Sequence, residues 1–101
     1  AKFSIGDIVK HKYFNFRGVI YDVDFEFNNS EEWYRSIPKD VRPRKDQPFY
    51  HLLAENNEIT YEAYVSEQNL ITDNSGEPVQ HPLVNEIFSE KKGSAYYKRS
   101  N

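Results

Sequence analysis

Alternation of apolar with other side chains between residues 17 and 25 constrains this fold more than any other feature of the sequence. Apolar Val19, Tyr21, Val23 and Phe25 alternate there with Gly18, Ile20, Asp22 and Asp24. A period of two is that of a β-strand, whose successive side chains point to opposite faces of the sheet. The segment therefore predicts a strand with one buried face and one mostly solvated face. Gly18 predicts a bulge or sharp bend in this strand, with a φ above zero.

Four further segments have the composition of short strands, namely residues 8–13, 49–54, 59–65 and 70–71. The second and third predict a hairpin, because the turn-forming residues 55–58 separate them. Residues 66–69 predict a single helical turn, and residues 81–88 a short C-terminal helix. Five strands with little helix indicate a mainly β fold, a small barrel of the SH3-like type, although an OB-like barrel fits as well. A length of 101 residues predicts one domain over residues 1–101.

Residues 28–48 form a long excursion between two predicted strands. Ser30 or Asn29 is placed to cap a short helix that begins with two acidic residues. Three prolines then prevent a longer helix or a central strand, namely Pro38, Pro43 and Pro48. Long excursions in compact domains are typically functional or mobile, so this one is a candidate binding segment.

Several classes of protein are disfavoured by what the chain lacks. There is no cysteine, which excludes disulfides, thiolate metal sites and cysteine nucleophiles. No apolar run approaches the roughly 18 residues that a membrane helix needs. No basic-then-apolar leader precedes the first strand, so we expect a cytoplasmic protein with no membrane partner.

Charge is distributed in blocks along the chain. The net charge is −3, which is a poor overall match for nucleic acid. Residues 46–90 contain nine acidic side chains and no Lys or Arg, whereas residues 35–45 and 91–101 are both basic. Two interpretations stay open: the basic segments are a solvated loop and a solvated tail, or they are two patches with different partners.

The first basic segment has a composition typical of binding. Its five cations are Arg35, Lys39, Arg42, Arg44 and Lys45, with Trp33, Tyr34, Phe49 and Tyr50 nearby. Lys and Arg neutralise phosphates, and aromatic rings stack on bases. The same cations equally suit an acidic protein partner.

Catalytic patterns are weak. The three histidines share no metal-site spacing, so no metal and no cofactor are expected. We expect His11 to face solvent, His51 to hydrogen-bond the backbone at the rim of the core, and His81 to cap the last helix. Asp22 and Asp24 lie two apart on one strand face and form, with His51, the one acid–base hypothesis. A solvated strand face explains the two aspartates more simply, and we expect no enzyme.

Four strings of residues carry a resemblance to a known family. They are Phe3-x-Ile5-Gly6-x2-Val9-x-His11; Phe16-Arg17-Gly18-Val19-Ile20-x-Asp22-x-Asp24; Lys45-Asp46-Gln47-Pro48-Phe49-Tyr50-His51-x-Leu53 after Trp33; and Tyr64-Val65-Ser66-Glu67-Gln68-Asn69-Leu70 with His81-Pro82 and Phe88. Together they resemble the YccV-like family, also called the heat shock protein HspQ or hemimethylated-DNA-binding protein family. The match extends over residues 3–88.

The resemblance implies an SH3-like barrel, no catalytic residues and a homo-oligomer, with a trimer as one candidate. It also implies binding to hemimethylated DNA at a replication origin. A further implied role, under heat stress, is partnership with the Lon protease in degrading selected proteins, including the replication initiator DnaA.

Because residues 46–90 repel phosphates, the sequence ranks modulation of a Lon-like cytoplasmic protease above recognition of hemimethylated DNA. The expected DNA- or partner-binding residues are Arg17, Arg35, Lys39, Arg42, Arg44, Lys45 and His51.

Overall fold

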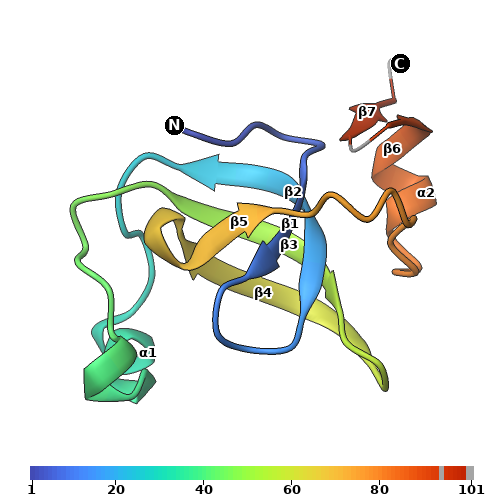
Figure 1. The fold of residues 1–101 in the computed structure, drawn as a ribbon. Coiled ribbons are helices and arrows are strands. Elements are labelled where there is room, and N and C mark those ends of the chain that lie inside the picture. The colour runs from blue at the N-terminus through green and yellow to red at the C-terminus, as the bar shows by residue number, and fades with distance from the viewer. Residues whose placement is uncertain (94, 100–101) are drawn as a thin grey trace.

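The chain folds into two antiparallel sheets, seen in a computed structural model that describes residues 1–93 and 95–99 (Figure 1). The strands are β1 (Ile8–His11), β2 (Arg17–Asp24), β3 (Phe49–Glu55), β4 (Thr60–Ser66), β5 (Leu70–Thr72), β6 (Phe88–Lys92) and β7 (Ala95–Lys98). The helices are α1 (Glu31–Ser36), α2 (Val84–Ile87) and the 3₁₀ turns η1 (Lys39–Val41) and η2 (Glu67–Asn69). The predicted mainly β fold, with a short inserted helix and a short C-terminal helix, is confirmed.

The main sheet has the spatial order β4-β3-β2-β1-β5, and each neighbouring pair is antiparallel. The predicted hairpin of β3 and β4 is present, with Leu52 opposite Ala63. Within the described ranges, β4 and β5 do not pair with each other, so hydrogen bonds do not close the expected barrel. β5 is only three residues long and all three pair with β1, which leaves β4 as a free edge.

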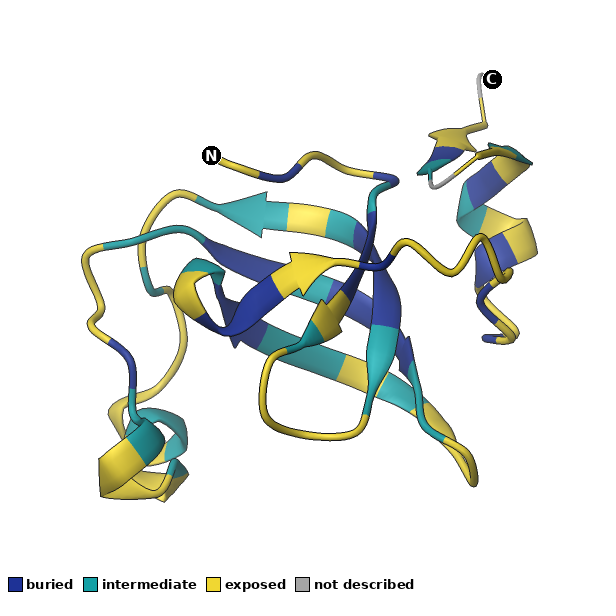
Figure 2. Ribbon diagram, viewed as in Figure 1, coloured by how far each residue is buried: buried dark blue, intermediate teal, exposed yellow. Residues whose placement is uncertain are grey.

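Both faces of the main sheet are buried at its centre (Figure 2). The inner core comprises Phe3, Val9, Ile20, Tyr50, Leu52, Ala54, Val65 and Leu70. The outer core comprises Ile8, Val19, Leu53, Val79, Val84, Phe88 and Tyr96. The prediction of one solvated face on β2 is therefore wrong at its centre, where Val19 and Ile20 are both fully buried on opposite faces. The C-terminal segment covers the second face, which a single strand's pattern does not reveal.

A bulge in β2 changes which residues share a face. Ile20 pairs with Leu52 and Asp22 pairs with His51, so Tyr21 has no opposite residue. An extra residue inverts the alternation beyond it. Val23 consequently packs on the inner core with Ile20, which corrects the predicted face, and Phe25 lies beyond the strand with 79% of its surface exposed.

Gly18 does not occupy this bulge and its φ is not positive, so the predicted placement is wrong. A Cβ built on Gly18 would lie 2.5 Å from the carbonyl oxygen of Leu53 and 3.0 Å from the Cα of Ala54. Glycine is required here because β2 and β3 approach closely, not because the backbone is left-handed.

Residues 88–92 and 95–98 form two strands, which corrects one of the two interpretations of the second basic segment, that of a solvated tail. β6 and β7 form a hairpin, and Tyr96 is only 8% exposed. The Tyr96 amide donates to the carbonyl of Gly6, and its hydroxyl accepts from the amide of Val79. The predicted helix over residues 81–88 shortens to four residues because Phe88 begins β6. None of the helices in the described part of the chain has the length and apolar character needed to cross a bilayer.

Candidate binding site

The excursion between β2 and β3 carries most of the predicted binding residues and projects from the sheet (Figure 1). Ser30 caps α1 as predicted, because its hydroxyl accepts from the amide of Trp33 at 3.0 Å. Helix α1 ends before Pro38, and η1 follows. We call residues 30–46 the projecting segment.

An aromatic cluster attaches the projecting segment to the sheet. Phe27 packs against Trp33, Tyr34 and Phe49, with ring centroids 5.3–5.9 Å apart. Tyr64 of β4 lies 5.3 Å from Trp33 and stacks on Phe49 at 5.2 Å. Aromatic pairs of this kind stabilise by about 0.5–1.5 kcal/mol beyond the area they bury. The segment is therefore held in a defined position, although no residue of α1 is itself buried.

The five cations of the projecting segment separate into two groups. Arg42 points inward: its guanidinium donates to the carbonyl oxygens of Ile37 and Arg35 and lies 5.6 Å from the Tyr34 ring. Lys45 pairs with Glu31 and lies 4.6 Å from the same ring. These two cations hold the segment together.

The other three cations point outward. The side chains of Arg35 and Arg44 are 74% and 77% exposed, and Lys39 is also exposed. Arg35 pairs with Glu31 at 3.4 Å and Arg44 with Asp46 at 2.8 Å. Because exposed ion pairs contribute only about 0–1 kcal/mol, a phosphate or carboxylate of a partner can replace either acid.

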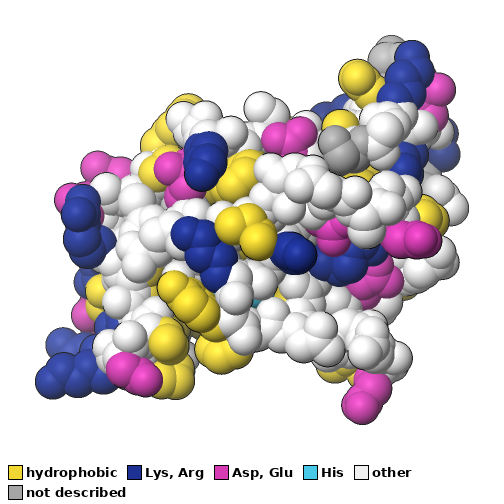
Figure 3. All heavy atoms as spheres, viewed as in Figure 1, with side chains coloured by type: hydrophobic (Ala, Val, Ile, Leu, Met, Phe, Trp, Pro, Cys, Tyr) yellow, Lys and Arg dark blue, Asp and Glu magenta, His cyan; other side chains and the backbone are white. Residues whose placement is uncertain are grey.

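The two basic segments of the sequence do not form one face. The projecting segment and the β6–β7 hairpin lie at opposite ends of the molecule (Figure 1). Figure 3 shows Lys and Arg side chains at both of these ends, and further ones across the middle of the face between them. The cations of the two ends therefore do not belong to one continuous group.

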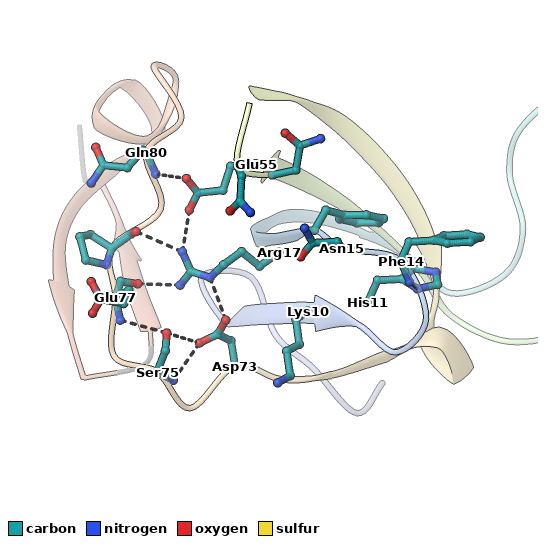
Figure 4. A pocket seen from close by; sticks show the side chains of 14 residues that line it. Lys10, His11, Phe14, Asn15, Arg17, Glu55, Asp73, Ser75, Glu77 and Gln80 are labelled. Carbon is teal, nitrogen blue, oxygen red and sulfur yellow. Dashed lines mark hydrogen bonds and ion pairs between the residues drawn. The ribbon is translucent and has the colours of Figure 1, made fainter. Parts of the chain in front are cut away.

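Arg17, the first predicted binding residue, makes internal contacts in a cleft of about 510 Å³ (Figure 4). Its guanidinium donates to the carboxylates of Glu55 and Asp73 and to the carbonyl oxygens of Glu77 and Pro78, at 2.6–3.1 Å. Burial lowers the pKa of Arg17, but these carboxylates outweigh it and the net pKa shift is upward. With these four hydrogen bonds inside the protein, the guanidinium of Arg17 stabilises the fold.

His51 lies beside Asp22 and Asp24, so the structure brings the residues of the acid–base hypothesis together. One carboxylate oxygen of each aspartate and one ring nitrogen of His51 all lie within 4.8 Å of one another. His51 Nε2 lies 2.9 Å from Asp24 Oδ2, which also accepts from the hydroxyl of Tyr64 at 2.7 Å. The predicted bond from His51 to the backbone is thus replaced by one to a side chain. Burial and the hydrogen bond to Asp24 raise the pKa of Tyr64 to about 12, so Tyr64 is a donor at neutral pH.

The other two histidines also have local roles. His11 is half-buried, not solvent-facing: its ring stacks on Phe14, and its Nδ1 accepts from the amides of Tyr13 and Phe14. His81 Nδ1 accepts from the amide of Leu83 at the start of α2, close to the predicted capping role.

A groove of about 340 Å³ between the projecting segment and the β1–β2 loop was not predicted. Aromatic and aliphatic side chains line most of it, including Trp33, Ile37 and Tyr64. The clustering of aromatic residues near position 33 is the one sequence signal that indicated it. That β4 also lines this groove could not be predicted without knowing the order of the strands in the sheet.

Comparisons with known proteins agree with the resemblance seen in the sequence. Residues 1–95 match the YccV-like family, described as hemimethylated DNA-binding protein YccV like. A segment of F-box only protein 21 is 35% identical over 95 residues in Homo sapiens and Pongo abelii, and 34% identical in Mus musculus. The matched segment covers 93% of this chain but only 15% of those relatives. No solved structure shows significant similarity to the chain.

Proposed function

The chain belongs to the YccV-like family, and from this premise we propose that it is a non-enzymatic module that binds hemimethylated DNA. The observation that carries the proposal is the group of outward cations on the projecting segment, which comprises Arg35, Lys39 and Arg44. The family description favours DNA over the protease, so we reverse the order in which the sequence alone placed the two.

The position of these cations suits contact with phosphates. The aromatic cluster and Arg42 fix the segment before a ligand arrives, which reduces the entropy lost on binding. Of the acidic side chains of residues 46–90, Asp46 belongs to the segment and pairs with Arg44, and Glu62 lines the groove beside it. Two more of those acids, Glu55 and Asp73, share the single positive charge of Arg17, so together they repel phosphates less than two unpaired carboxylates would.

Phosphate contacts supply affinity and position but no preference between methylation states. Such a preference needs a contact at the base edges of the major groove, where a methyl group lies. The two properties therefore require two measurements.

The test is fluorescence anisotropy with unmethylated, hemimethylated and fully methylated duplexes of one sequence, at several salt concentrations. We expect the hemimethylated duplex to bind tightest and every affinity to fall steeply as salt rises. Undetectable binding, or affinity that does not change with salt, would contradict DNA binding. Equal affinity for the three duplexes would contradict methylation recognition alone.

Modulation of a Lon-like protease in the cytoplasm is the second candidate. The apolar groove beside the projecting segment supports it, because such a surface suits a protein better than DNA. The rate at which purified protease degrades DnaA, measured with and without this protein, tests the idea. An unchanged rate rejects it. The homo-oligomer stays a prediction, for which sedimentation velocity is the direct measurement.

A further inference from the structure

The free edge of β4 offers unpaired backbone groups beside the groove. The amide of Ile20 donates to the carbonyl of Asp7, and the carbonyl of Ile20 accepts from the amide of Gly6. Both partners precede β1, so these two groups of Ile20 point away from β3. Leu52 lies opposite Ile20, so its backbone amide and carbonyl point toward β4, where they form hydrogen bonds with the backbone of Ala63. By alternation, Glu62 and Tyr64 point their amides and carbonyls away from the sheet. Outside the sheet ladder, no backbone hydrogen bond in the described ranges involves residues 60–66.

The groove follows this same edge. Five consecutive residues of β4 line it, Tyr61 through Val65, which is expected of a groove beside a strand's edge and not over one of its faces. Ile37, Pro38 and Val41 line it on the projecting segment, and Phe14 and Phe16 on the β1–β2 loop. Phe14 is 51% exposed, so apolar surface here lacks a cover. Figure 3 shows hydrophobic side chains gathered along this lower border of the molecule.

We propose that this groove binds an extended peptide segment of a partner protein, which pairs with β4 as an additional antiparallel or parallel strand. Main-chain bonds to Glu62 and Tyr64 would supply register, and every second peptide side chain would face the aromatic lining. Five strand residues span about 17 Å, which suits a peptide of about five to seven residues.

Charge indicates the composition of the peptide. Arg35 and Lys39 are exposed on the projecting segment directly beside the lining residues Ser36, Ile37 and Pro38. The lining itself contains one carboxylate, Glu62, and it accepts from the hydroxyl of Tyr21. The favoured peptide therefore has an apolar residue at every second position and an acidic residue at the end near α1. A second copy of β4 fits less well, because each copy brings its own projecting segment and β1–β2 loop to the same edge.

A random heptapeptide display library is the probe, selected on the wild-type protein and counter-selected on Glu62→Pro. Proline removes the outward amide of Glu62, whereas the matched control Glu62→Thr keeps it and also lacks the carboxylate. We expect enriched peptides with alternate apolar residues and an acidic residue, and affinity at least tenfold weaker for Glu62→Pro than for Glu62→Thr. Thermal melting establishes that both variants fold.

Amide hydrogen exchange with a selected peptide provides a second measurement that needs no substitution. We expect slower exchange at Glu62 and Tyr64, with Tyr61 and Ala63 unchanged. No enriched peptide, or protection confined to another surface, overturns the proposal. A wild-type dimer that Glu62→Pro dissociates would assign the edge to a second copy and also overturns it. DNA affinity measured on Glu62→Pro should equal that of the wild type, which separates this inference from the proposed function.

Discussion

Arg17 Nε lies 2.7 Å from Asp73 Oδ2, and this contact joins the start of β2 to the end of β5. The same guanidinium reaches Glu55 at the end of β3 and two carbonyls in residues 77–78. The segment that leads to the outer core is therefore fixed to the main sheet by Arg17, and also by Glu55, whose carboxylate accepts from the amide of Gln80. Burial raises the pKa of Asp73, but bonds from Ser75 and Arg17 outweigh it and the net pKa shift is downward.

Replacement of this arginine should destabilise the fold. In Arg17→Lys a single ammonium group replaces the planar guanidinium, which forms four hydrogen bonds. At least one of the two carboxylates therefore loses its partner. Breaking such a partly buried network costs about 3 kcal/mol. Urea unfolding measures the loss, with the exposed Arg35→Lys as a matched control expected to change stability by less than about 0.5 kcal/mol. Equal effects of the two substitutions would contradict the role given to Arg17.

Gly18→Ala should also destabilise, through contact and not through strain in φ. The added Cβ would meet the backbone of Leu53 and Ala54, which cannot move without shifting β3, so we expect a loss of about 2 kcal/mol or more. Gly76→Ala is the contrast, because Gly76 has a φ of 75° but no atom near its Cβ position. Its loss should be about 1 kcal/mol. Thermal unfolding of both variants decides, and a smaller loss at Gly18 than at Gly76 would refute the close approach.

His11 should make stability fall in mild acid. Burial lowers the pKa of His11 below 6.5, and its Nδ1 accepts two amides, so the folded state favours the neutral ring. As pH falls, the unfolded chain binds a proton at His11 before the folded state does. The stability that His11 contributes is therefore fully present above about pH 6.5 and is lost as the pH falls toward the lower pKa of the folded state. The unfolding free energy of wild type minus that of His11→Asn, measured from about pH 7 to about pH 5, should decrease. A constant or rising difference would show that His11 is not held neutral.

Ser66→Ala should leave the fold as stable or make it more stable. Ser66 is fully buried in β4, and its hydroxyl has no hydrogen-bond partner among the described residues. An unpaired buried hydroxyl is unfavourable by about 1–3 kcal/mol, and alanine removes it. Ser30→Ala, which deletes the α1 cap, should have the opposite sign and cost about 1 kcal/mol. Denaturant midpoints compare the two, and a clear loss in Ser66→Ala would indicate a hidden partner.

Local sequence rules predicted those elements whose stability is local. The Ser30 cap, the β3–β4 hairpin and the turn at residues 67–69 follow from side chains within a few positions of one another. The faces of β2 could not be predicted in this way. The bulge at Tyr21 and the cover over Val19 depend on residues 49–55 and 79–96, which only the folded chain brings near.

The candidate site shows the same division. Composition identified the cations of residues 35–45, but not that Arg42 points inward while Arg35 and Arg44 point outward. Arg17 resembled a binding residue because its partners Glu55 and Asp73 are distant in sequence. The β4 edge was not recognised because an edge is a property of strand order, not of composition.

The salt dependence of DNA binding by two triple variants tests the central claim most directly. One variant is Arg35→Gln, Lys39→Gln and Arg44→Gln on the projecting segment; the control is Lys91→Gln, Lys92→Gln and Lys98→Gln on the β6–β7 hairpin. Each lost phosphate contact reduces the slope of log affinity against log salt by about 0.9, so the first variant should lose up to about 2.7 and the control should match the wild type. Wild-type slope and affinity in the first variant, or an equal loss in both, would contradict DNA binding through the projecting segment.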